Sequence, residues 1–353
     1  MPVPQRYSAD ALRRYAAALM AAAGMDAELA GEVAFVLVEG DLLGHDTHGL
    51  QLLAGYLGEL ERGTMTPAGD PEVIAERAAV ATWDGRRLPG PALVRRAIQW
   101  ARPRAIEQGA ATVVIRRSHH IACLAAYLEP VARDGLLIQL FSSDPAVASV
   151  APFGGTQAVF TPNPLAVGIP TSTDPILIDI SASVTTNGMS NRLKAAGQRG
   201  ASAWWLDALG QPTDDPAVLA ANPPGTILPL GGLDAGHKGY GLALLVETLT
   251  AGLAGYGRAD LVEGWGASVC IQLYDPRAFG GLDAFARQLD WLVNACHASA
   301  PRDPGAPVRL PGERALARKR AQLVHGVQLH PQILPALHEW SQRLRVPAPE
   351  PMT

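Results

Sequence analysis

Two histidine-containing segments carry the residue types best suited to chemistry. The first is Gly44-His45-Asp46-Thr47-His48-Gly49, whose flanking glycines permit backbone angles that other residues avoid. An imidazole beside a hydroxyl and a carboxylate can be held in one tautomer with a pKa near neutrality, which suits a general acid. The same residues also fit a polar turn at the end of a helix. We therefore take His48, with Thr47 and Asp46, as candidate catalytic residues.

The second segment is Ser118-His119-His120, which follows the β-type run Thr112–Ile115. Ligands in α/β proteins collect at the ends of strands, so His120 is a second candidate catalytic residue. A surface turn is the alternative interpretation of this segment.

The histidines of these segments also raise the question of a metal site. His45 and His48 have helical spacing, and His119 and His120 are adjacent, but no HExxH or other carboxylate–histidine motif accompanies them. We therefore expect no metal site.

A glycine-rich segment, Gly231–Gly241, leads into a long apolar run and has the composition of an anion site. The N–H groups at a helix start, together with glycines and Lys238, suit a phosphate or pyrophosphate group. Lys238 is not followed by Ser or Thr, as a Walker loop requires, and the chain has no G-x-G-x-x-G fingerprint. A flexible glycine-rich loop is the alternative.

Two further segments have the character of pocket walls. Thr161–Leu165 and Asp179-Ile180-Ser181 place short polar side chains beside β-type runs. Ordinary strand–turn chemistry explains the same pattern. A hydrolase is disfavoured, because the sequence has no G-x-S-x-G elbow and no cysteine in an evident thiolate setting.

The elements that must position these residues follow from capping and periodicity. Ser8 and Asp26 can cap two amphipathic helices, the second ending near Gly44. Gly239–Leu253 has a single charged residue, so we expect a long buried helix there. Further helices are expected at 50–62, 91–108, 282–298, 314–324 and 331–343, and strands at 80–83, 112–115, 136–141, 165–169, 176–180 and 267–274.

Composition narrows the class of protein. The 353 residues are 48% hydrophobic, so the chain can bury a core larger than that of one small domain. A net charge of -4 disfavours nucleic acid or an anionic membrane as the main partner. Three cysteines without a CxxC pair fit a reduced cytoplasm, and neither a signal peptide nor a membrane-spanning run is evident.

The order of these motifs resembles the type-2 malate/L-lactate dehydrogenase family. The pattern runs His-x-x-His-Gly, Ser-x-His after a strand, Thr-x-Asn-Pro-Leu, Asp-x-Ser, and Gly-x-Lys-Gly-x-Gly before an apolar helix. The resemblance extends from about Ser8 to about Arg345 and includes Arg309–Glu313. The family includes ureidoglycolate and sulfolactate dehydrogenases, diketogulonate reductase and piperideine/pyrroline-2-carboxylate reductases.

The resemblance implies a mixed α/β fold that is not a Rossmann fold. We expect a helical lobe from residues 1–75 and 310–353, and a mixed-sheet lobe from residues 76–309 that binds cofactor and substrate. The resemblance further implies NAD or NADP as cofactor, a small-molecule substrate and a homodimer.

Residue roles carry over where the motifs match. The family histidine that corresponds to His48 is the proposed proton donor, supported by the hydroxyl residue at the position of Thr47. His120 corresponds to a second histidine, described as a proton acceptor in some members. The implied cofactor contacts are Pro175, Ile176, Leu177, Ile178, Asp179, Ile180, Ser181, His237, Lys238, Gly239, Gly312 and Glu313.

Two departures from the family pattern fall in the expected substrate pocket, which also includes Asn163. Leu52 stands where the family usually has an arginine that grips the substrate carboxylate, and an apolar side chain cannot make that contact. Ala122 stands where a glycine is usual. We therefore expect hydride transfer between a nicotinamide and a carbonyl carbon, with an atypical 2-oxo or 2-hydroxy acid-like substrate. Reduction of a cyclic imine and a catalytically silent homologue are the alternatives.

Overall fold

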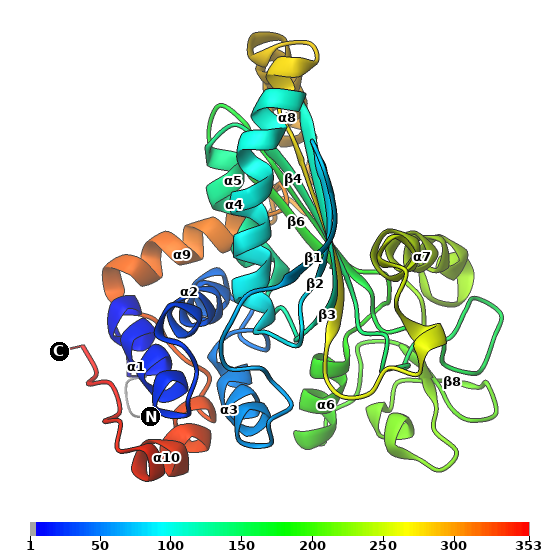
Figure 1. The fold of residues 1–353 in the computed structure, drawn as a ribbon. Helices are drawn as coiled ribbons and strands as arrows, with labels where there is room; N and C mark the ends of the chain where they lie inside the picture. The colour runs from blue at the N-terminus through cyan, green and yellow to red at the C-terminus, as the bar shows by residue number, and fades with distance from the viewer. Residues whose placement is uncertain (1–4, 353) are drawn as a thin grey trace.

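The computed structural model describes residues 5–352, which form a mixed sheet beside a helical lobe, as the resemblance implies (Figure 1). Most predicted elements are confirmed, and three strands, β2, β6 and β10, begin where predicted. The helices are α1 Ala9–Ala22, α2 Ala27–Leu43, α3 Leu53–Glu61, α4 Gly90–Gln108, α5 Leu128–Arg133, α6 Asn187–Ala195, α7 Gly232–Glu247, α8 Leu282–Ala298, α9 Glu313–His325 and α10 Ile333–Leu344.

The main sheet has seven strands in the order β1-β2-β3-β10-β4-β5-β6. Only β2 and β3 pair in parallel within it; the other neighbours are antiparallel. Strand β6 is therefore an edge strand. The bounds are β1 Glu72–Arg77, β2 Val80–Asp84, β3 Ala110–Ser118, β4 Leu137–Ser143, β5 Pro164–Ile169, β6 Ile176–Ser181 and β10 Ala267–Tyr274.

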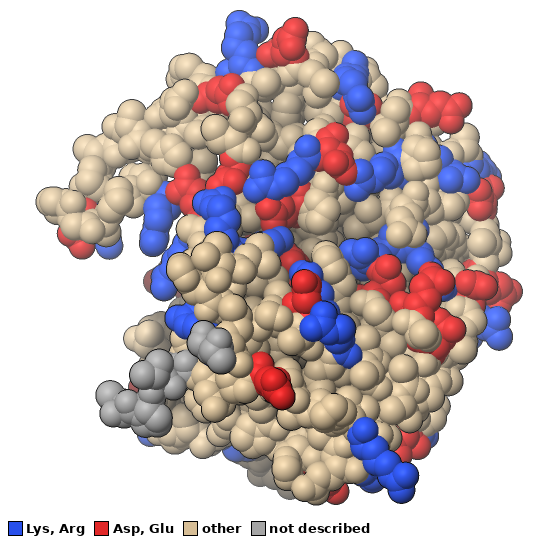
Figure 2. All heavy atoms as spheres, turned by 90° about the vertical axis from the view of Figure 1, so that its left-hand side faces the viewer, with Lys and Arg blue, Asp and Glu red and all other residues tan. Residues whose placement is uncertain are grey.

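The helical lobe joins the two ends of the described chain (Figure 1). Ser8 caps α1 and Asp26 caps α2 through side-chain bonds to backbone N–H groups, as predicted. Helix α1 packs against α10, where the hydroxyls of Tyr15 and Ser341 lie 2.5 Å apart. On the face shown in Figure 2, acidic and basic side chains are interspersed. The exact lobe boundaries, at 75/76 and 309/310, stay a prediction.

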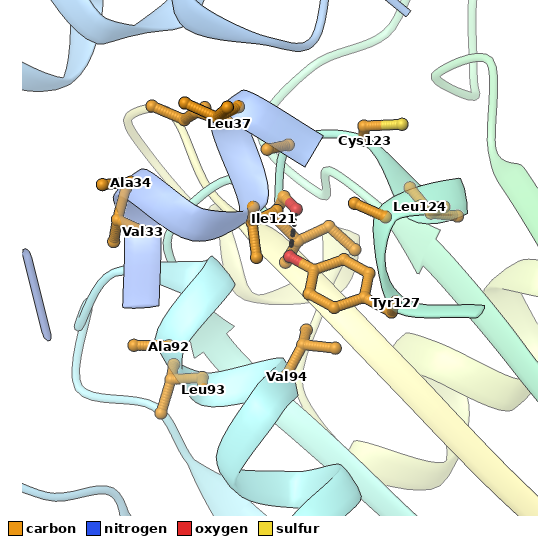
Figure 3. Close-up of a cluster of buried hydrophobic side chains, with 14 of the residues drawn as sticks. Val33, Ala34, Leu37, Ala92, Leu93, Val94, Ile121, Cys123, Leu124 and Tyr127 are labelled. Atoms are coloured by element: carbon orange, nitrogen blue, oxygen red, sulfur yellow. Dashed lines mark hydrogen bonds between the residues drawn. The ribbon is translucent and has the colours of Figure 1, made fainter. Parts of the chain in front are cut away.

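One hydrophobic core lies beneath the two histidine segments. Figure 3 shows side chains of α2 and α4 packed against the segment Ile121–Tyr127, which directly follows His120. The Tyr127 hydroxyl donates to the Ile121 carbonyl oxygen at 2.5 Å and closes this segment on itself. The core therefore fixes the end of α2, and hence His48, relative to the His120 segment.

The expected long buried helix at Gly239–Leu253 is wrong in two respects. Helix α7 begins at Gly232 and a π-helical segment, Thr248–Gly252, follows it. Its leucines are also not buried: Leu244 and Leu245 are nearly half exposed and Leu253 is 54% exposed. An apolar run indicates a helix surface that is unfavourable in water, but it does not show that another part of this chain packs against that surface.

Several short elements were not predicted. Besides β1, α5 and α6, a second sheet of order β8-β7-β9 consists of Trp205–Leu206, Pro212–Thr213 and Thr226–Ile227. Two-residue strands are too short to show a hydrophobic period. Within residues 5–352, no helix has the length and apolar character needed to cross a membrane.

Candidate active site

The first histidine segment is a tight turn held by a buried carboxyl group. Helix α2 ends at Leu43, and its C-cap, Gly44, adopts the left-handed conformation with φ 89°. Asp41, in the last turn of α2, accepts a hydrogen bond from the Leu50 N–H at 2.8 Å, and burial raises the pKa of Asp41 to about 8. A Cβ atom on Gly49 would lie 2.4 Å from Asp41 Oδ1, so the turn packs directly on this side chain.

His48 projects from this turn with one ring nitrogen engaged. Its Nδ1 lies 2.9 Å from the Thr47 hydroxyl, and among residues 5–352 its Nε2 has no hydrogen-bond partner. Burial lowers the pKa of His48, the Asp179 carboxylate opposes this, and His45 and Arg192 lower it further. His48 is therefore neutral at pH 7, with Nε2 available to a ligand.

His120 lies beside His48, although 72 positions separate them in the sequence. The two rings are stacked, with centroids 6.0 Å apart and planes 28° from parallel. His120 Nδ1 accepts a hydrogen bond from the Ala122 N–H at 3.3 Å, so in the neutral ring Nε2 carries the proton. Burial, with His48 and His119, holds the pKa of His120 well below its usual value.

Aromatic residues that sequence reasoning missed surround His120. The Tyr56 hydroxyl lies 2.9 Å from His120 Nδ1, and the Trp265 ring centroid is 4.7 Å from that of His120. Tyr56 has a weak signal in the sequence, because it lies two helical turns beyond His48 on the run predicted as a helix. Trp265 has none, since it reaches the site from the loop before β10.

His119 has a structural setting. Its side chain is fully buried, its Nε2 lies 3.3 Å from Glu59 Oε2, and burial lowers its pKa to about 4 against the opposing effect of Glu59. Ala122 adopts φ 58°, a left-handed conformation that glycine adopts without strain. The substitution noted in the sequence therefore places a strained residue two positions after His120.

Asp46 and Thr47 occupy different places in the site. Thr47 contacts the ring of His48, whereas Asp46 Oδ1 accepts a hydrogen bond from Arg192 Nη1 of α6 at 3.0 Å. Arg192 Nη2 also donates to Gln51 Oε1 at 2.6 Å. Helix α6 thus contacts the histidine turn, and the Cβ position of its Gly188 lies 4.0 Å from His48 Cε1.

Strand β6, which holds six of the twelve predicted cofactor contacts, is bordered by glycines at both ends. Leu177 donates its N–H to the Pro311 carbonyl oxygen, and a Cβ on Gly312 would lie 2.8 Å from Leu177. At the other end, a Cβ on Gly239 would lie 2.3 Å from the Leu230 nitrogen and 2.7 Å from the Ala182 oxygen. The three predicted cofactor segments therefore meet along one strand.

The remaining predicted cofactor residues are placed individually. Ile180 is 41% exposed, and Glu313 Oε1 lies 2.5 Å from His297 Nε2. Lys238 is exposed in α7, shortly after an irregularity at Ala235, while the Gly239 N–H donates to the Leu230 carbonyl oxygen at 3.1 Å and is not free. The other positions are buried Pro175 and Ile176, half-buried Ile178 and Ser181, and exposed His237.

Asp179 joins β6 to the His120 segment. Its carboxylate accepts a hydrogen bond from the Ala125 N–H at 2.8 Å and acts electrostatically on His48. The predicted pocket residues differ: Leu52 is half-buried beside the core, whereas the Asn163 amide is engaged, donating to Glu247 Oε1 at 3.0 Å and accepting from the Thr161 hydroxyl at 2.5 Å. Asn163 thus has a structural network of its own.

Comparisons with known proteins agree with this arrangement. The family profile described as malate/L-lactate dehydrogenase matches residues 7–338. An L-lactate dehydrogenase from Cupriavidus necator is 30% identical over 351 residues, covering 98% of this chain and 99% of that protein.

Two solved structures are also similar over nearly the whole chain. A malate dehydrogenase from Pyrococcus horikoshii has a TM-score of 0.86 and 26% identity, covering 97% of this chain and 96% of that one. A delta1-piperideine-2-carboxylate reductase from Pseudomonas syringae pvar. tomato has a TM-score of 0.83 and 27% identity, covering 95% and 99%. The chain belongs to the malate/L-lactate dehydrogenase family and is an oxidoreductase of the nicotinamide-dependent kind typical of it.

Proposed function

We propose that this protein transfers a hydride between a nicotinamide and the carbonyl carbon of a 2-oxo or 2-hydroxy acid-like substrate. The observation that carries the proposal is the stacked pair of His48 and His120, whose ring centroids lie 6.0 Å apart and whose Nε2 atoms have no hydrogen-bond partner among residues 5–352. When His48 Nδ1–H donates to the Thr47 hydroxyl, His48 Nε2 is a proton acceptor in the neutral ring, whereas His120 Nε2–H is a donor. This combination can bind a reacting oxygen and move its proton.

The two histidines have complementary roles in this mechanism. In the oxidation direction, neutral His48 removes the proton of the substrate hydroxyl while His120 Nε2–H donates a hydrogen bond to the same oxygen. In the reduction direction, protonated His48 returns the proton to the developing alkoxide. The Thr47 hydroxyl, which is hydrogen-bonded to His48 Nδ1, fixes the orientation of the His48 ring. The bound nicotinamide supplies or accepts the hydride.

The cofactor, NAD or NADP, would contact β6 together with Lys238-Gly239 and Gly312-Glu313. Three features of the chain fit such a group. Strand β6 is an edge strand with one side of its backbone unpaired by other strands. Lys238 offers a cation for phosphate, and Asp179 brings the strand next to His48.

Arg192 is the group that we assign to the substrate carboxylate in place of the arginine missing at position 52. Its guanidinium bonds Gln51, the neighbour of Leu52, and it is close enough to His48 to lower the pKa of that ring. The ion pair with Asp46 leaves donor N–H groups on the guanidinium, which has five in all. A carboxylic acid substrate therefore stays compatible with Leu52.

The test combines cofactor binding with two histidine variants. NADH and NADPH are titrated by fluorescence, and the wild type is then screened on 2-oxo acids with the tighter-binding cofactor. We expect His48→Asn and His120→Asn to lower kcat by about 10²–10⁴-fold with an unchanged cofactor Kd, because they remove the proton transfer. His325→Asn, on an exposed side chain of α9, is the matched control. Turnover near that of the wild type in both variants would refute the assignment.

Reduction of a cyclic imine is the second candidate, favoured by the likeness to the piperideine-carboxylate reductase. The same histidine pair would then bind the imine nitrogen and transfer its proton. Parallel assays with a 2-oxo acid and a cyclic imino acid of similar size separate the two functions. A catalytically silent homologue need not bind NADH or NADPH in the fluorescence titration, and it would turn over neither substrate.

A homodimer is part of the proposal, and helix α8 supports it. Among residues 5–352, α8 has no buried residue, and Trp291 and nearby Phe279 are each 68% exposed. Light scattering after gel filtration would give the mass, and Trp291→Glu would shift it toward one chain if a second copy covers this face.

A further inference from the structure

Three potential metal ligands from separate segments meet beside His48. His45 comes from the turn after α2, Cys123 follows the His120 segment, and Asp179 lies on β6. One ligand atom from each lies within 4.8 Å of the other two, and Cys123 Sγ is 4.0 Å from Asp179 Oδ2. This set shares only His45 with the four histidines of the two histidine segments. Cys123 and Asp179 are distant from His45 in the sequence, and the fold brings them to it.

The backbones that carry these ligands are held in place. The Cβ position of Gly40 in α2 lies 3.2 Å from Cys123 Cβ, so α2 and the Cys123 segment are in close contact. The His45 N–H donates to the Gly40 carbonyl oxygen at 2.8 Å, and the Ala125 N–H anchors the Asp179 carboxylate. Bringing the ligands together therefore needs only side-chain adjustment.

We propose that His45, Cys123 and Asp179 bind one zinc ion. Imidazole, thiolate and carboxylate are all ligands of Zn²⁺, and in tetrahedral coordination their donor atoms lie about 3.3–3.7 Å apart. The observed separations of the ligand atoms are up to 4.8 Å. Side-chain shifts of about 1 Å would reduce them to the tetrahedral range. The thiol releases its proton to solvent on binding, and a water molecule completes the four ligands.

Zinc at this position inhibits the enzyme, a consequence that rests on the proposed function. Asp179 acts on His48 and belongs to the strand assigned to the cofactor. A metal that takes up this carboxylate places a charged group next to the proton-transfer site. Metal binding itself does not depend on the reaction, so the zinc site and the inhibition of hydride transfer can be tested separately.

The experiment measures binding directly. The wild type is dialysed against micromolar Zn²⁺ and its metal content determined, and Co²⁺ is added separately to look for the thiolate-to-cobalt absorption band. We expect about one equivalent of zinc in the wild type, and affinity at least about 10–100-fold weaker in Cys123→Ser and His45→Ala. Cys296→Ser and His325→Ala, which alter a cysteine and a histidine outside the cluster, should bind as the wild type does.

Two results would overturn the site. One is a wild type that retains no zinc and gives no thiolate band with Co²⁺. The other is Cys123→Ser and His45→Ala variants that remain folded by circular dichroism and bind zinc as tightly as the controls do. If zinc binds at the cluster but hydride transfer is unaffected, the site stands and the inhibitory role is refuted.

Discussion

The histidine pair and strand β6 are two parts of the candidate site, but different features of the chain form them. His48 and His120 are fixed by side chains: Thr47 holds one ring, and Tyr56 and Trp265 lie against the other. Along β6 neighbouring segments approach closely, because Gly239 and Gly312 have no side chain to keep them apart.

This difference indicates how each region can be altered. The histidine region depends on which atoms the side chains present, so removing an atom changes the chemistry and leaves the backbone in place. The β6 region depends on close approach of backbones, so adding an atom displaces whole segments. We expect the first kind of change to lower kcat and the second to weaken cofactor binding and folding stability together.

The largest effect is expected from adding a methyl group at Gly239. A Cβ atom there would lie 2.3–2.7 Å from three backbone atoms of Leu230 and Ala182, which cannot move independently. We expect Gly239→Ala to lower the free energy of unfolding by about 2–3 kcal/mol and to raise the Kd for the cofactor. Urea denaturation and fluorescence titration measure the two quantities.

Gly241→Ala is the matched control, since it lies in the same helix and nothing is within 4 Å of its Cβ position. It should raise stability by about 0.5–1 kcal/mol, as alanine does for glycine inside a helix. Equal effects of the two substitutions would show that close backbone approach does not form this region.

The same distinction explains what could be predicted from the sequence. Caps at Ser8 and Asp26, and the runs of β6 and β10, are local patterns, and the structure has them as predicted. The ion pair of Arg192 and Asp46 depends on packing between elements that are distant in the sequence, and no local sequence pattern predicts it.

The site itself was predictable in part. The motif residues His48 and His120 converge, but Trp265 and the cluster of His45, Cys123 and Asp179 have no signature in the sequence. Helix α7 was predicted as buried because its composition is apolar, whereas burial depends on the surrounding surfaces.

The second prediction concerns substrate charge. Arg192→Leu should raise KM for a 2-oxo acid by about 10–150-fold, because a charge-assisted hydrogen bond contributes about 1.5–3 kcal/mol. KM for the corresponding amide should change little. Adding Leu52→Arg to this variant should restore binding of the acid, since it returns a guanidinium to the same turn.

Arg199→Leu serves as the control for charge, because Arg199 pairs with Asp214 away from the histidine turn. Steady-state kinetics on the acid and the amide distinguish the cases. If Arg192→Leu raises KM equally for both compounds, Arg192 supports the pocket without binding the carboxylate.

The pH dependence gives the third prediction. Burial lowers the pKa of His48 below 6.5, so the neutral ring required for oxidation predominates above that pH. The kcat/KM for oxidation should be flat above about pH 6.5 and fall tenfold per pH unit below the lowered pKa. The kcat/KM for reduction, which needs protonated His48, should fall as the pH rises through the same value. An oxidation profile that continues to rise above pH 7 would contradict a neutral His48 in the free enzyme.

The smallest effect is expected at Tyr56, whose substitution tests whether a side-chain contact in the histidine region changes kcat alone. Tyr56→Phe removes the hydroxyl that lies 2.9 Å from His120 Nδ1 and keeps the ring that packs beside Trp265. Losing one neutral hydrogen bond costs about 1 kcal/mol, so kcat should fall about fivefold. Because the contact orients a side chain and separates no backbones, the cofactor Kd should not change. Single-turnover rates at saturating cofactor, with Kd from fluorescence, measure both. A weaker cofactor complex with unchanged kcat would mean that the two regions are not separable in the way their contacts indicate.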